Sequence, residues 1–480
     1  MKKQEGPKKH YKLSIFFIAL VAIAGGLLLT ALIYLQVTGQ FAALTEAIRE
    51  IVAQNTIYGI LILFWVIIIP LMLVLIFVLN LFRRDRFKKI KKGWEDAARI
   101  VAEKEAAARK REEEKKKQTI SRFGTLNSYD HKSSVRKADQ AALALTLGDF
   151  CDNFRMFAAQ KFRLYYDISV IRQFVAGLAV SHLMILQGMS GTGKTSIAYA
   201  FGEFLGNSSE IVPVQPVWKE RTDLLGYYNE FTKKYNETPF LQKMYQANAS
   251  DKLYVVVLDE LNIARVEYYF AEFLSLLEIP DPNSRYLEVV PDRWPTDPAG
   301  LQNGRIRLPD NMWFIGTANN DDSTFAISDK VYDRAMVINL DSKAEPFLPD
   351  GDEVRCVPIS AAGFRKLIAS AQAGYEITNR NMRRLRELDE YLIEKFQITF
   401  GNRIMRQIKD YISVYVGCGG DEMEALDDII SKKVLRKLEM QNAVYVKNQA
   451  EALCNYLCEL FGETKVPKCI AYVRRVARNA

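Results

Sequence analysis

The most constraining feature of the sequence is a glycine-rich segment between a short apolar stretch and a stretch of helical character. Residues 188–195 are Gly-Met-Ser-Gly-Thr-Gly-Lys-Thr, which satisfies the pattern G-x-x-x-x-G-K-[ST] in full. The apolar residues 182–187 precede it, and the helical segment 196–205 follows it. In a strand–loop–helix unit, such glycines let backbone N–H groups turn towards phosphates, and the helix N-terminus adds positive potential. We therefore expect this loop to bind the phosphates of a nucleotide.

Two side chains of the loop have expected chemical roles. Lys194 would neutralise the β- and γ-phosphates, and the Thr195 hydroxyl would bind Mg²⁺. A chance match to the bare pattern is the alternative, but the strand and the helix around the loop argue against it. The residues expected to contact the nucleotide are Gly188, Met189, Ser190, Gly191, Thr192, Gly193, Lys194, Thr195 and Ser196.

A second apolar run ends in two acidic residues. Residues 253–258 are Leu-Tyr-Val-Val-Val-Leu, and Asp259 and Glu260 follow them. An unbroken apolar run of this length is typical of a strand that is buried on both faces of a parallel sheet. We expect Asp259 to hold Mg²⁺ as a metal-site residue and Glu260 to orient or activate the attacking water. The alternative is a helix N-terminus with an acidic first turn.

Three more short apolar runs complete an expected α/β fold with a five-stranded parallel sheet. They are residues 210–214, 312–316 and 335–340, and helical segments separate them. Asn319 follows the second of these runs, where a polar side chain can reach the γ-phosphate. Arg334 directly precedes the last run, where it could contact the site of a neighbouring subunit in a ring.

The N-terminal part of the chain differs in composition from the rest. Residues 13–35 and 57–82 are apolar and uncharged, and each run is long enough to cross a bilayer core of roughly 30 Å as a helix. Basic residues flank the pair at 2–12 and 83–92, and the connecting loop has almost none. This bias predicts a hairpin of two transmembrane helices in the bacterial inner (cytoplasmic) membrane, a multi-pass topology with both termini in the cytosol. A cleavable signal peptide would explain only the first run, which is too long for one.

Composition divides the chain into four expected regions. Residues 1–83 form the transmembrane hairpin, and residues 84–135 form a charged helical stalk with a flexible linker at 121–134. Residues 136–345 form the α/β domain, and 346–480 form an α-helical lid with a C-terminal tail. With three histidines and no C-x-x-C pair, we expect no zinc site. Much of the net charge of +8 lies beside the apolar runs, so it is weak support for nucleic-acid binding, and a nucleic-acid partner stays open.

These motifs resemble the AAA+ superfamily, in the branch that contains the McrB restriction NTPases and the MoxR-like chaperones. The resemblance covers about residues 166–440. Residues 258–265 look like the McrB-type D-E-I-N-R-A element, and residues 315–322 look like the I-G-T-M-N-x-x-D element. Residues 225–239 are similar to the helix-2 insert, a hairpin that points into the ring pore in this branch. Ile263 stands where McrB-type proteins carry an arginine, so the resemblance leaves the nucleotide open: we expect ATP, with GTP as the alternative.

The resemblance implies a role for several further residues. Asn319 would be the sensor-1 residue, Arg334 the arginine finger, Asp322 part of the family signature, and Arg403 the sensor-2 residue of the helical lid. It implies a nucleoside-triphosphate hydrolase with Mg²⁺ and ATP or GTP as cofactors, assembled as a homo-hexameric ring. The alternative for both arginines is an ion pair on their own surface, and for the hairpin an ordinary exposed turn.

Three functions are compatible with these features. The first is a membrane-anchored ring that uses nucleotide hydrolysis to remodel a partner protein, encoded nearby, at the cytosolic membrane face. The second is an McrB-like motor subunit of an anti-phage or restriction-type defence system that acts with a separate effector nuclease. The third is a nucleotide-gated membrane signalling scaffold with little turnover. No nuclease motif is visible in the sequence, and the N-terminal hairpin stands where McrB-type proteins often have a DNA-reading domain. Both points disfavour a restriction role.

Overall fold

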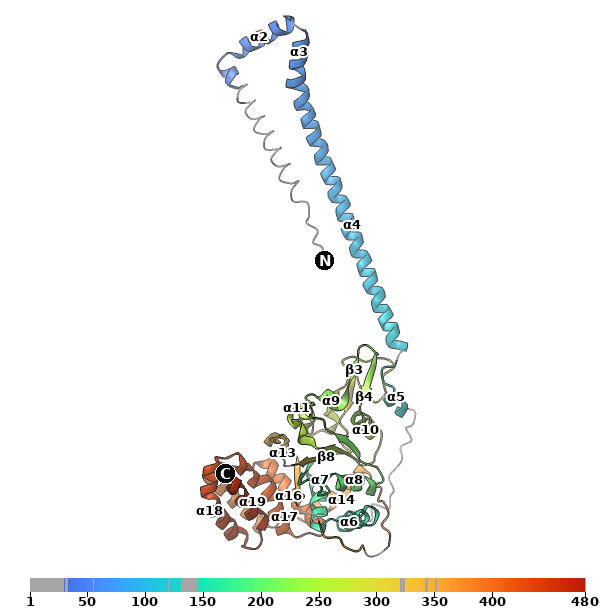
Figure 1. The fold of residues 1–480 in the computed structure, drawn as a ribbon, viewed down its shortest axis with the longest axis vertical. Coiled ribbons are helices and arrows are strands. Elements are labelled where there is room, and N and C mark those ends of the chain that lie inside the picture. Colours follow the sequence, from blue (N-terminus) through green and yellow to red (C-terminus); the bar gives the residue numbers. More distant parts are fainter. Residues whose placement is uncertain are drawn as a thin grey trace. The chain divides into compact units, whose positions relative to one another are not determined.

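The computed structural model describes residues 30, 33–54, 56–119, 121–130, 145–319, 324–341, 344–349 and 352–479. The chain divides into two compact units, residues 1–112 and 113–480. All strands of the described chain belong to the second unit (Figure 1).

The first unit is helical throughout its described elements. It contains α2 (Phe41–Gln54), α3 (Thr56–Leu63), the π-helical turn η1 (Phe64–Ile68) and most of α4 (Ile69–Thr119). The second half of α4 is rich in alanine, glutamate, lysine and arginine, all of which have high helix propensity. The helix that the sequence predicts after residue 84 is therefore present as part of α4.

The prediction of two transmembrane helices is wrong. Among the described residues, no helix combines the length and the apolar character that crossing a bilayer requires. The apolar run 57–82 is divided among α3, η1 and the start of α4. Within α4 the apolar part ends before Arg83, so it covers about 14 residues or about 21 Å, less than the roughly 30 Å core. Pro70, which has no N–H for the helical ladder, lies just after the π-helical turn.

The expected localisation depended on the same two helices. The assignment to the bacterial inner membrane, with a multi-pass topology and both termini in the cytosol, is therefore also wrong. Most of the first apolar run, residues 13–35, lies outside the described residues.

The second unit is built around the predicted five-stranded parallel sheet. Its strand order is β2–β5–β8–β1–β9, and each neighbouring pair is parallel. The strands are β1 (Leu183–Gly188), β2 (Glu210–Pro213), β5 (Tyr254–Asp259), β8 (Met312–Asn319) and β9 (Met336–Asn339). Because β8 lies between β5 and β1, the C-terminal ends of these three strands meet at one edge of the sheet.

Side chains of each strand alternate between two hydrophobic cores. In β5, Val255 and Val257 enter one core, whereas Val256 and Leu258 enter the other. Burial on both faces explains why the strands are continuous apolar runs. The helices over the first face include α6 (Leu147–Phe162), α7 (Ile168–Val180) and α8 (Lys194–Phe204), and those over the second include α10 (Pro239–Asn248), α11 (Val266–Tyr269) and α12 (Ala271–Leu276).

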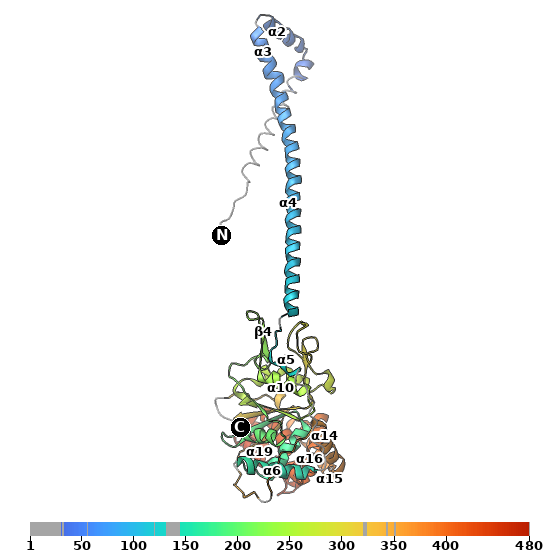
Figure 2. The same cartoon turned by 90° about the vertical axis from the view of Figure 1, so that its right-hand side faces the viewer.

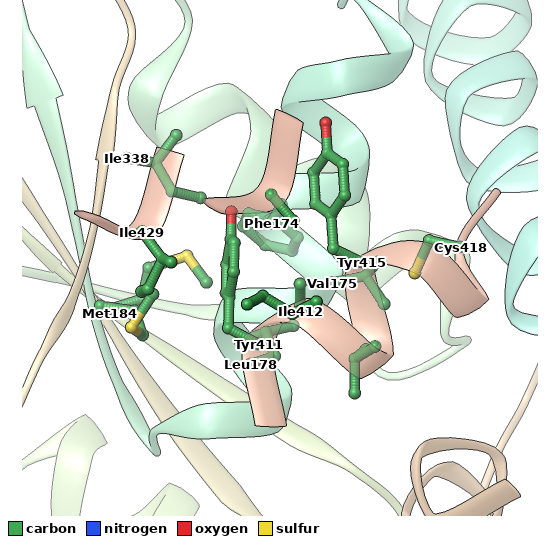
Figure 3. Packing of buried hydrophobic residues seen from close by; sticks show 14 of the residues in the cluster. Phe174, Val175, Leu178, Met184, Ile338, Tyr411, Ile412, Tyr415, Cys418 and Ile429 are labelled. Atoms are coloured by element: carbon green, nitrogen blue, oxygen red, sulfur yellow. The ribbon is translucent and has the colours of Figure 1, made fainter. Parts of the chain in front are cut away.

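The C-terminal region is helical and shares the first core. Its helix α16 (Asn402–Gly417) packs against α7, where Tyr411 and Ile412 lie beside Phe174 and Val175, and Ile429 lies beside Met184 and Ile338 (Figure 3). The core therefore joins this region directly to the sheet domain. Its elements are α14 (Ala361–Gly374), α15 (Asn379–Phe396), α16 (Asn402–Gly417), α17 (Glu422–Ile429), η5 (Ile430–Val434), η6 (Leu435–Met440), α18 (Ala443–Phe461) and α19 (Pro467–Asn479).

Two short antiparallel hairpins extend the sheet domain. One pairs β3 (Gly226–Asn229) with β4 (Lys234–Glu237), so the hairpin expected within 225–239 is present. The other pairs β6 (Tyr286–Glu288) with β7 (Arg305–Arg307). The short helical elements are α9 (Arg221–Leu225), η3 (Leu261–Ile263), η4 (Pro282–Ser284) and α13 (Asp329–Tyr332).

The segment predicted to be a flexible linker, residues 121–134, is folded in its described part. Its described part contains a short helix, α5 (Thr125–Asp130), and Phe123 and Leu126 are fully buried. In Figures 1 and 2, α5 lies beside β4 and α10, at the end of the unit that carries the β3–β4 hairpin. Residues 121–130 are therefore packed onto the domain.

Candidate functional site

The glycine-rich loop follows β1 directly and leads into α8. Gly188 has a φ of 152°, and a Cβ at this position would stand 2.3 Å from the carbonyl oxygen of Leu340, so only glycine fits. Gly193 has a φ of 89° and is the N-cap of α8, and the Tyr166 hydroxyl donates a hydrogen bond to its carbonyl at 3.0 Å. The strand–loop–helix context that the motif requires is thus present.

The ammonium group of Lys194 lies inside the curve of the glycine-rich loop. Lys194 is 7% exposed, and its ammonium donates hydrogen bonds to the carbonyl oxygens of Gly188 at 3.0 Å and Met189 at 2.8 Å. The ammonium therefore lies at the N-terminus of α8, where the helix dipole also favours an anion. This placement suits a phosphate group.

The threonine that follows the lysine meets the acidic strand. The Thr195 hydroxyl donates to Oδ1 of Asp259 at 2.7 Å, although the two residues are 64 apart in the sequence. Hydroxyl and carboxylate oxygens are the hard donors that Mg²⁺ prefers, with water and phosphate oxygens as the other ligands. The residues present therefore fit a magnesium ion bound beside a nucleotide phosphate.

A threonine that the sequence analysis missed joins the two acidic residues. Thr317 in β8 donates its hydroxyl proton to Oδ1 of Asp259 at 2.8 Å and accepts a hydrogen bond from the backbone N–H of Glu260 at 2.8 Å. Thr317 is 2% exposed, so its hydroxyl is shielded from water. A lone hydroxyl inside an apolar strand needs a buried partner, and this is the sequence signal that could have identified it.

Glu260 has a strained backbone. Its φ of 54° and ψ of 47° place it in the left-handed region, which costs a non-glycine residue on the order of 1–3 kcal/mol. The bond to Thr317 and the bond from the Ile263 N–H to the Glu260 carbonyl at 2.9 Å hold this conformation. Its side chain is exposed at the end of β5. Strain that the surrounding structure maintains is typical of functional sites.

Asn319 ends β8 next to the glycine-rich loop. It is paired in register with Gly188. The buried side chain of Asn262 donates to the Asn319 carbonyl at 3.0 Å and so ties the segment after Glu260 to the end of β8. Asn262 belongs to the motif after the acidic strand, but the sequence analysis gave it no role. Asp322 lies outside the described residues.

Arg334 and Arg403 meet at one carboxylate. Arg334 donates to Oε2 of Glu278 at 2.7 Å, and Arg403 donates to Oε1 of the same residue. Arg403 also lies 3.4 Å from Oδ2 of Asp333. The hydrogen bond and charge of Arg334, together with the charge of Arg403, hold the pKa of Glu278 below its usual value. The structure thus brings together two arginines from regions that are far apart in the sequence.

A buried lysine from the C-terminal region holds the turn that carries Arg334. The Lys433 ammonium donates to the carbonyl oxygens of Tyr332 at 2.9 Å, Asp333 at 3.3 Å and Ala335. Burial lowers the pKa of Lys433 to about 7. The C-terminal region therefore fixes the backbone on both sides of Arg334.

A cavity adjoins the glycine-rich loop. Its volume is about 380 Å³, and Tyr166, Asp167 and Val170 line it opposite residues 191–193 and 339–341. A pocket of this size with aromatic and apolar walls suits the base and sugar of a nucleotide. The sequence analysis did not identify these lining residues, because they come from segments without a motif.

Comparisons with known proteins support the nature of this domain. Residues 183–335 match the model of the AAA domain of the dynein-related subfamily, and residues 355–480 match a domain of unknown function, DUF8727. No curated protein matches the chain. Among solved structures, a full-length MCM homolog from Methanopyrus kandleri is similar at 12% identity and a TM-score of 0.34, over 62% of each chain. The family match confirms the expected AAA+ ATPase domain over residues 183–335.

Proposed function

We propose that this chain, which carries an AAA+ ATPase domain, works in the McrB- and MoxR-like manner as a ring of identical subunits that hydrolyses ATP to remodel a partner protein. One observation carries the hydrolytic part: Thr195, Asp259 and Thr317 converge through hydrogen bonds of 2.7 and 2.8 Å at the end of the sheet where Glu260 is exposed. This arrangement places the residues proposed to hold Mg²⁺ beside the Glu260 carboxylate, which is proposed to orient the attacking water.

The side chains divide the work of phosphoryl transfer. Lys194 and the N–H groups at the start of α8 bind the phosphates, and Thr195 and Asp259 hold Mg²⁺. When bound, Mg²⁺ neutralises charge on the phosphate oxygens. The carboxylate of Glu260 orients the attacking water and accepts its proton. Because Thr317 bonds to both Asp259 and Glu260, it fixes the metal-binding and the water-binding carboxylates relative to each other.

Within this chain Arg334 and Arg403 form ion pairs on their own surface, which is the alternative to a role in a shared site of a ring. Arginine is planar and always charged, so it suits a phosphoryl group whose charge is spread over several oxygens. In a ring, Arg334 would serve as the finger for the nucleotide of the neighbouring subunit, and Arg403 would lie beside it. Glu278 holds both guanidinium groups on one surface.

The tip of the β3–β4 hairpin supports action on a polypeptide. Phe231 is 99% exposed, and Lys233 and Lys234 lie next to it. An isolated aromatic ring with neighbouring lysines can grip a chain of varied sequence through apolar contact and charge. The tip would face the central channel if the ring has the arrangement that the resemblance implies.

The test measures phosphate release by the purified chain with Mg²⁺ and either ATP or GTP. Wild-type protein should hydrolyse ATP in preference to GTP, and Glu260→Gln should bind ATP but release almost no phosphate. A Phe231→Ala variant with normal basal hydrolysis should lose partner remodelling, with Val217→Ala, a change at another exposed apolar residue, as the control. Rapid hydrolysis by the Glu260→Gln variant would overturn the proposed mechanism.

A further inference from the structure

Residues 121–130, which we call the strap, follow the C-terminal end of α4 and are bonded to two separate loops of the sheet domain. The first loop is the β3–β4 hairpin, and the second comprises residues 289–304, between β6 and β7. We infer that the strap couples these two loops, so that a nucleotide-dependent movement of either loop reaches residues 121–130. This inference rests on the proposed nucleotide binding at the loop 188–195.

A buried arginine fastens the strap to residues 289–304. The side chain of Arg122 is 2% exposed, and its Nε and Nη2 donate to the two carboxylate oxygens of Asp297, both at 2.8 Å. Nη1 also donates to Oδ1 of Asp292 at 3.2 Å, and the guanidinium lies 4.5 Å from the ring centre of Trp294. A two-pronged pair between buried charges fixes orientation as well as distance, which a single ammonium could not do.

The electrostatics of this contact favour the charged form of the arginine. Burial lowers the pKa of Arg122, but the hydrogen bonds and charges of Asp297 and Asp292 outweigh burial, so the pKa is raised overall. Breaking the pair would leave Asp297, which is 1% exposed, without its cation. The strap therefore cannot leave residues 289–304 without exposing or stranding a charge.

The same strap is bonded to the β3–β4 hairpin. The backbone N–H of Tyr235 donates to the Arg122 carbonyl at 2.8 Å, and the Phe123 ring stacks on the Tyr235 ring with centroids 4.9 Å apart. Glu237 at the end of β4 accepts hydrogen bonds from the N–H groups of Thr125 at 2.8 Å and Leu126 at 3.3 Å. Glu237 thus satisfies the start of α5, because the first N–H groups of a helix have no partner within it.

The far end of the strap is also held. Asp130 accepts one hydrogen bond from the Tyr245 hydroxyl of α10 and one from the backbone N–H of Ala299 at 2.8 Å. Asn127 donates to the carbonyl of Thr296 at 3.1 Å. Residues 289–304 are therefore attached along the strap from Arg122 to Asp130, whereas the β3–β4 hairpin is attached to its first part, residues 122–126.

Each loop is linked to a strand that carries a residue of the nucleotide site, β5 with Asp259 or β8 with Thr317. The β3–β4 hairpin lies between β2 and α10 in the sequence. Just after β2, the N–H of Val214 donates a hydrogen bond to the carbonyl of Asp259 in β5 at 3.1 Å. Arg221 just before the hairpin pairs with Glu272 of α12 at 2.6 Å. Residues 289–304 lie between α12 and β8, the strand that carries Thr317. A shift at Asp259 and Thr317 on nucleotide binding is therefore applied to both loops that the strap joins.

The experiment compares hydrogen exchange in the full chain with and without Mg²⁺ and AMP-PNP, a slowly hydrolysed ATP analogue. In the wild type, AMP-PNP should change exchange in residues 226–237 and in residues 121–130 together. In Arg122→Met the change in 226–237 should persist, but the strap should exchange roughly tenfold faster and lose its response to AMP-PNP. Arg293→Met is the matched control, because Arg293 is exposed in the same loop as Asp292. It should behave as the wild type.

The outcomes separate the strap from the proposed function. If AMP-PNP does not bind to the wild type, the proposed function fails and the strap inference fails with it. If AMP-PNP binds and changes residues 226–237 but leaves residues 121–130 unchanged in the wild type, only the strap inference is overturned. That wild-type comparison decides the question even if Arg122→Met does not fold, and Asp297→Asn provides a second variant that breaks the same pair.

Discussion

At the scale of single residues, the site contains groups of two kinds. Groups of the first kind belong to local motifs, and the sequence predicts them because each motif marks the end of a strand and the loop that follows. They are Lys194, Thr195, Asp259 and Glu260. The role of Thr317 comes from the position of β8 between β5 and β1, which brings its hydroxyl to both acidic residues. No local pattern contains that information, because it depends on the order of strands in the sheet.

The hydroxyl of Thr317 should therefore matter for turnover more than for binding. Thr317→Val keeps the shape of the side chain but removes both hydrogen bonds, and each bond to a buried or charged group is worth about 1–3 kcal/mol. We expect kcat to fall roughly 10- to 100-fold with little change in ATP affinity. Thr317→Ser keeps the hydroxyl and should retain most of the activity. Equal losses in the valine and serine variants, measured by phosphate release, would contradict this role.

Lys194 and Glu260 should differ in the step that each supports. Lys194 meets the phosphates in the ground state, so Lys194→Ala should abolish ATP binding. Glu260 acts on the water during the reaction, so Glu260→Gln should keep binding and stop turnover. Fluorescent-nucleotide titration and phosphate release measure the two properties separately. The same loss of affinity in both variants would show that the roles are wrongly assigned.

At the scale of elements, the apolar runs predict the five strands of the sheet, but the sequence does not predict the contacts of the short segments. Residues 121–134 are mostly polar and small, so the sequence predicts a linker. In the structure, Arg122 and Phe123 contact residues more than 100 positions away in the sequence. The carboxylate of Glu237 accepts a hydrogen bond from the first N–H group of α5. Similarly, nothing near Lys433 in the sequence indicates that its ammonium holds the turn with Arg334. Such contacts depend on tertiary packing.

Lys433 should make stability depend on pH. Its folded-state pKa of about 7 lies below the value of roughly 10.4 in an unfolded chain, so between these values the unfolded chain binds the additional proton. The free energy of unfolding should therefore rise with pH in this window, by up to about 1.4 kcal/mol per pH unit from this group. The Tm of the wild type minus that of Lys433→Met should increase between about pH 7 and 10. The exposed Lys409→Met variant is the baseline, and a difference that stays constant with pH would refute the assignment.

At the scale of the whole molecule, composition predicts that apolar, charged and mixed sequence follow one another along the chain. It does not predict where an apolar helix is interrupted. The apolar run 57–82 has the length of a membrane span, yet the structure interrupts it with a π-helical turn before Pro70. Hydropathy measures the sum of the side chains and contains no information about the continuity of the helix. The division into two units falls between residues 112 and 113, inside the charged part of α4, whereas composition predicts that the globular sequence begins at residue 136.

The second unit should fold without the first. A chain of residues 113–480 retains both hydrophobic cores and the strap, so we expect it to fold cooperatively and to bind ATP. A chain of residues 145–480 lacks the strap and leaves Asp297 without Arg122, so its Tm should be lower by several degrees. Circular dichroism melts of the two fragments test this difference. Aggregation of the longer fragment would show that residues 1–112 contribute to the fold.

Assembly into a ring can be tested by mixing two inactive variants. Arg334→Ala should bind ATP almost normally but hydrolyse it at least about a thousand times more slowly, since a finger arginine is worth roughly 10³–10⁵ in rate. Lys194→Ala should not bind ATP but still carries Arg334. A mixture should regain part of the activity, because a Lys194→Ala subunit can offer its arginine to an intact neighbouring site. Near wild-type hydrolysis by Arg334→Ala, or no recovery on mixing, would exclude a shared site.

The strap also has a consequence for biosynthesis. Arg122 and its partner Asp297 are separated by 175 residues, so the ribosome makes the strap long before its docking site exists. At roughly 5–20 residues per second, the interval is about 9–35 s. During this interval the Arg122 guanidinium lacks its partner Asp297, although the β3–β4 hairpin, on which the Phe123 ring packs, has already been made. Docking of the strap is therefore complete only after residue 297 has been made.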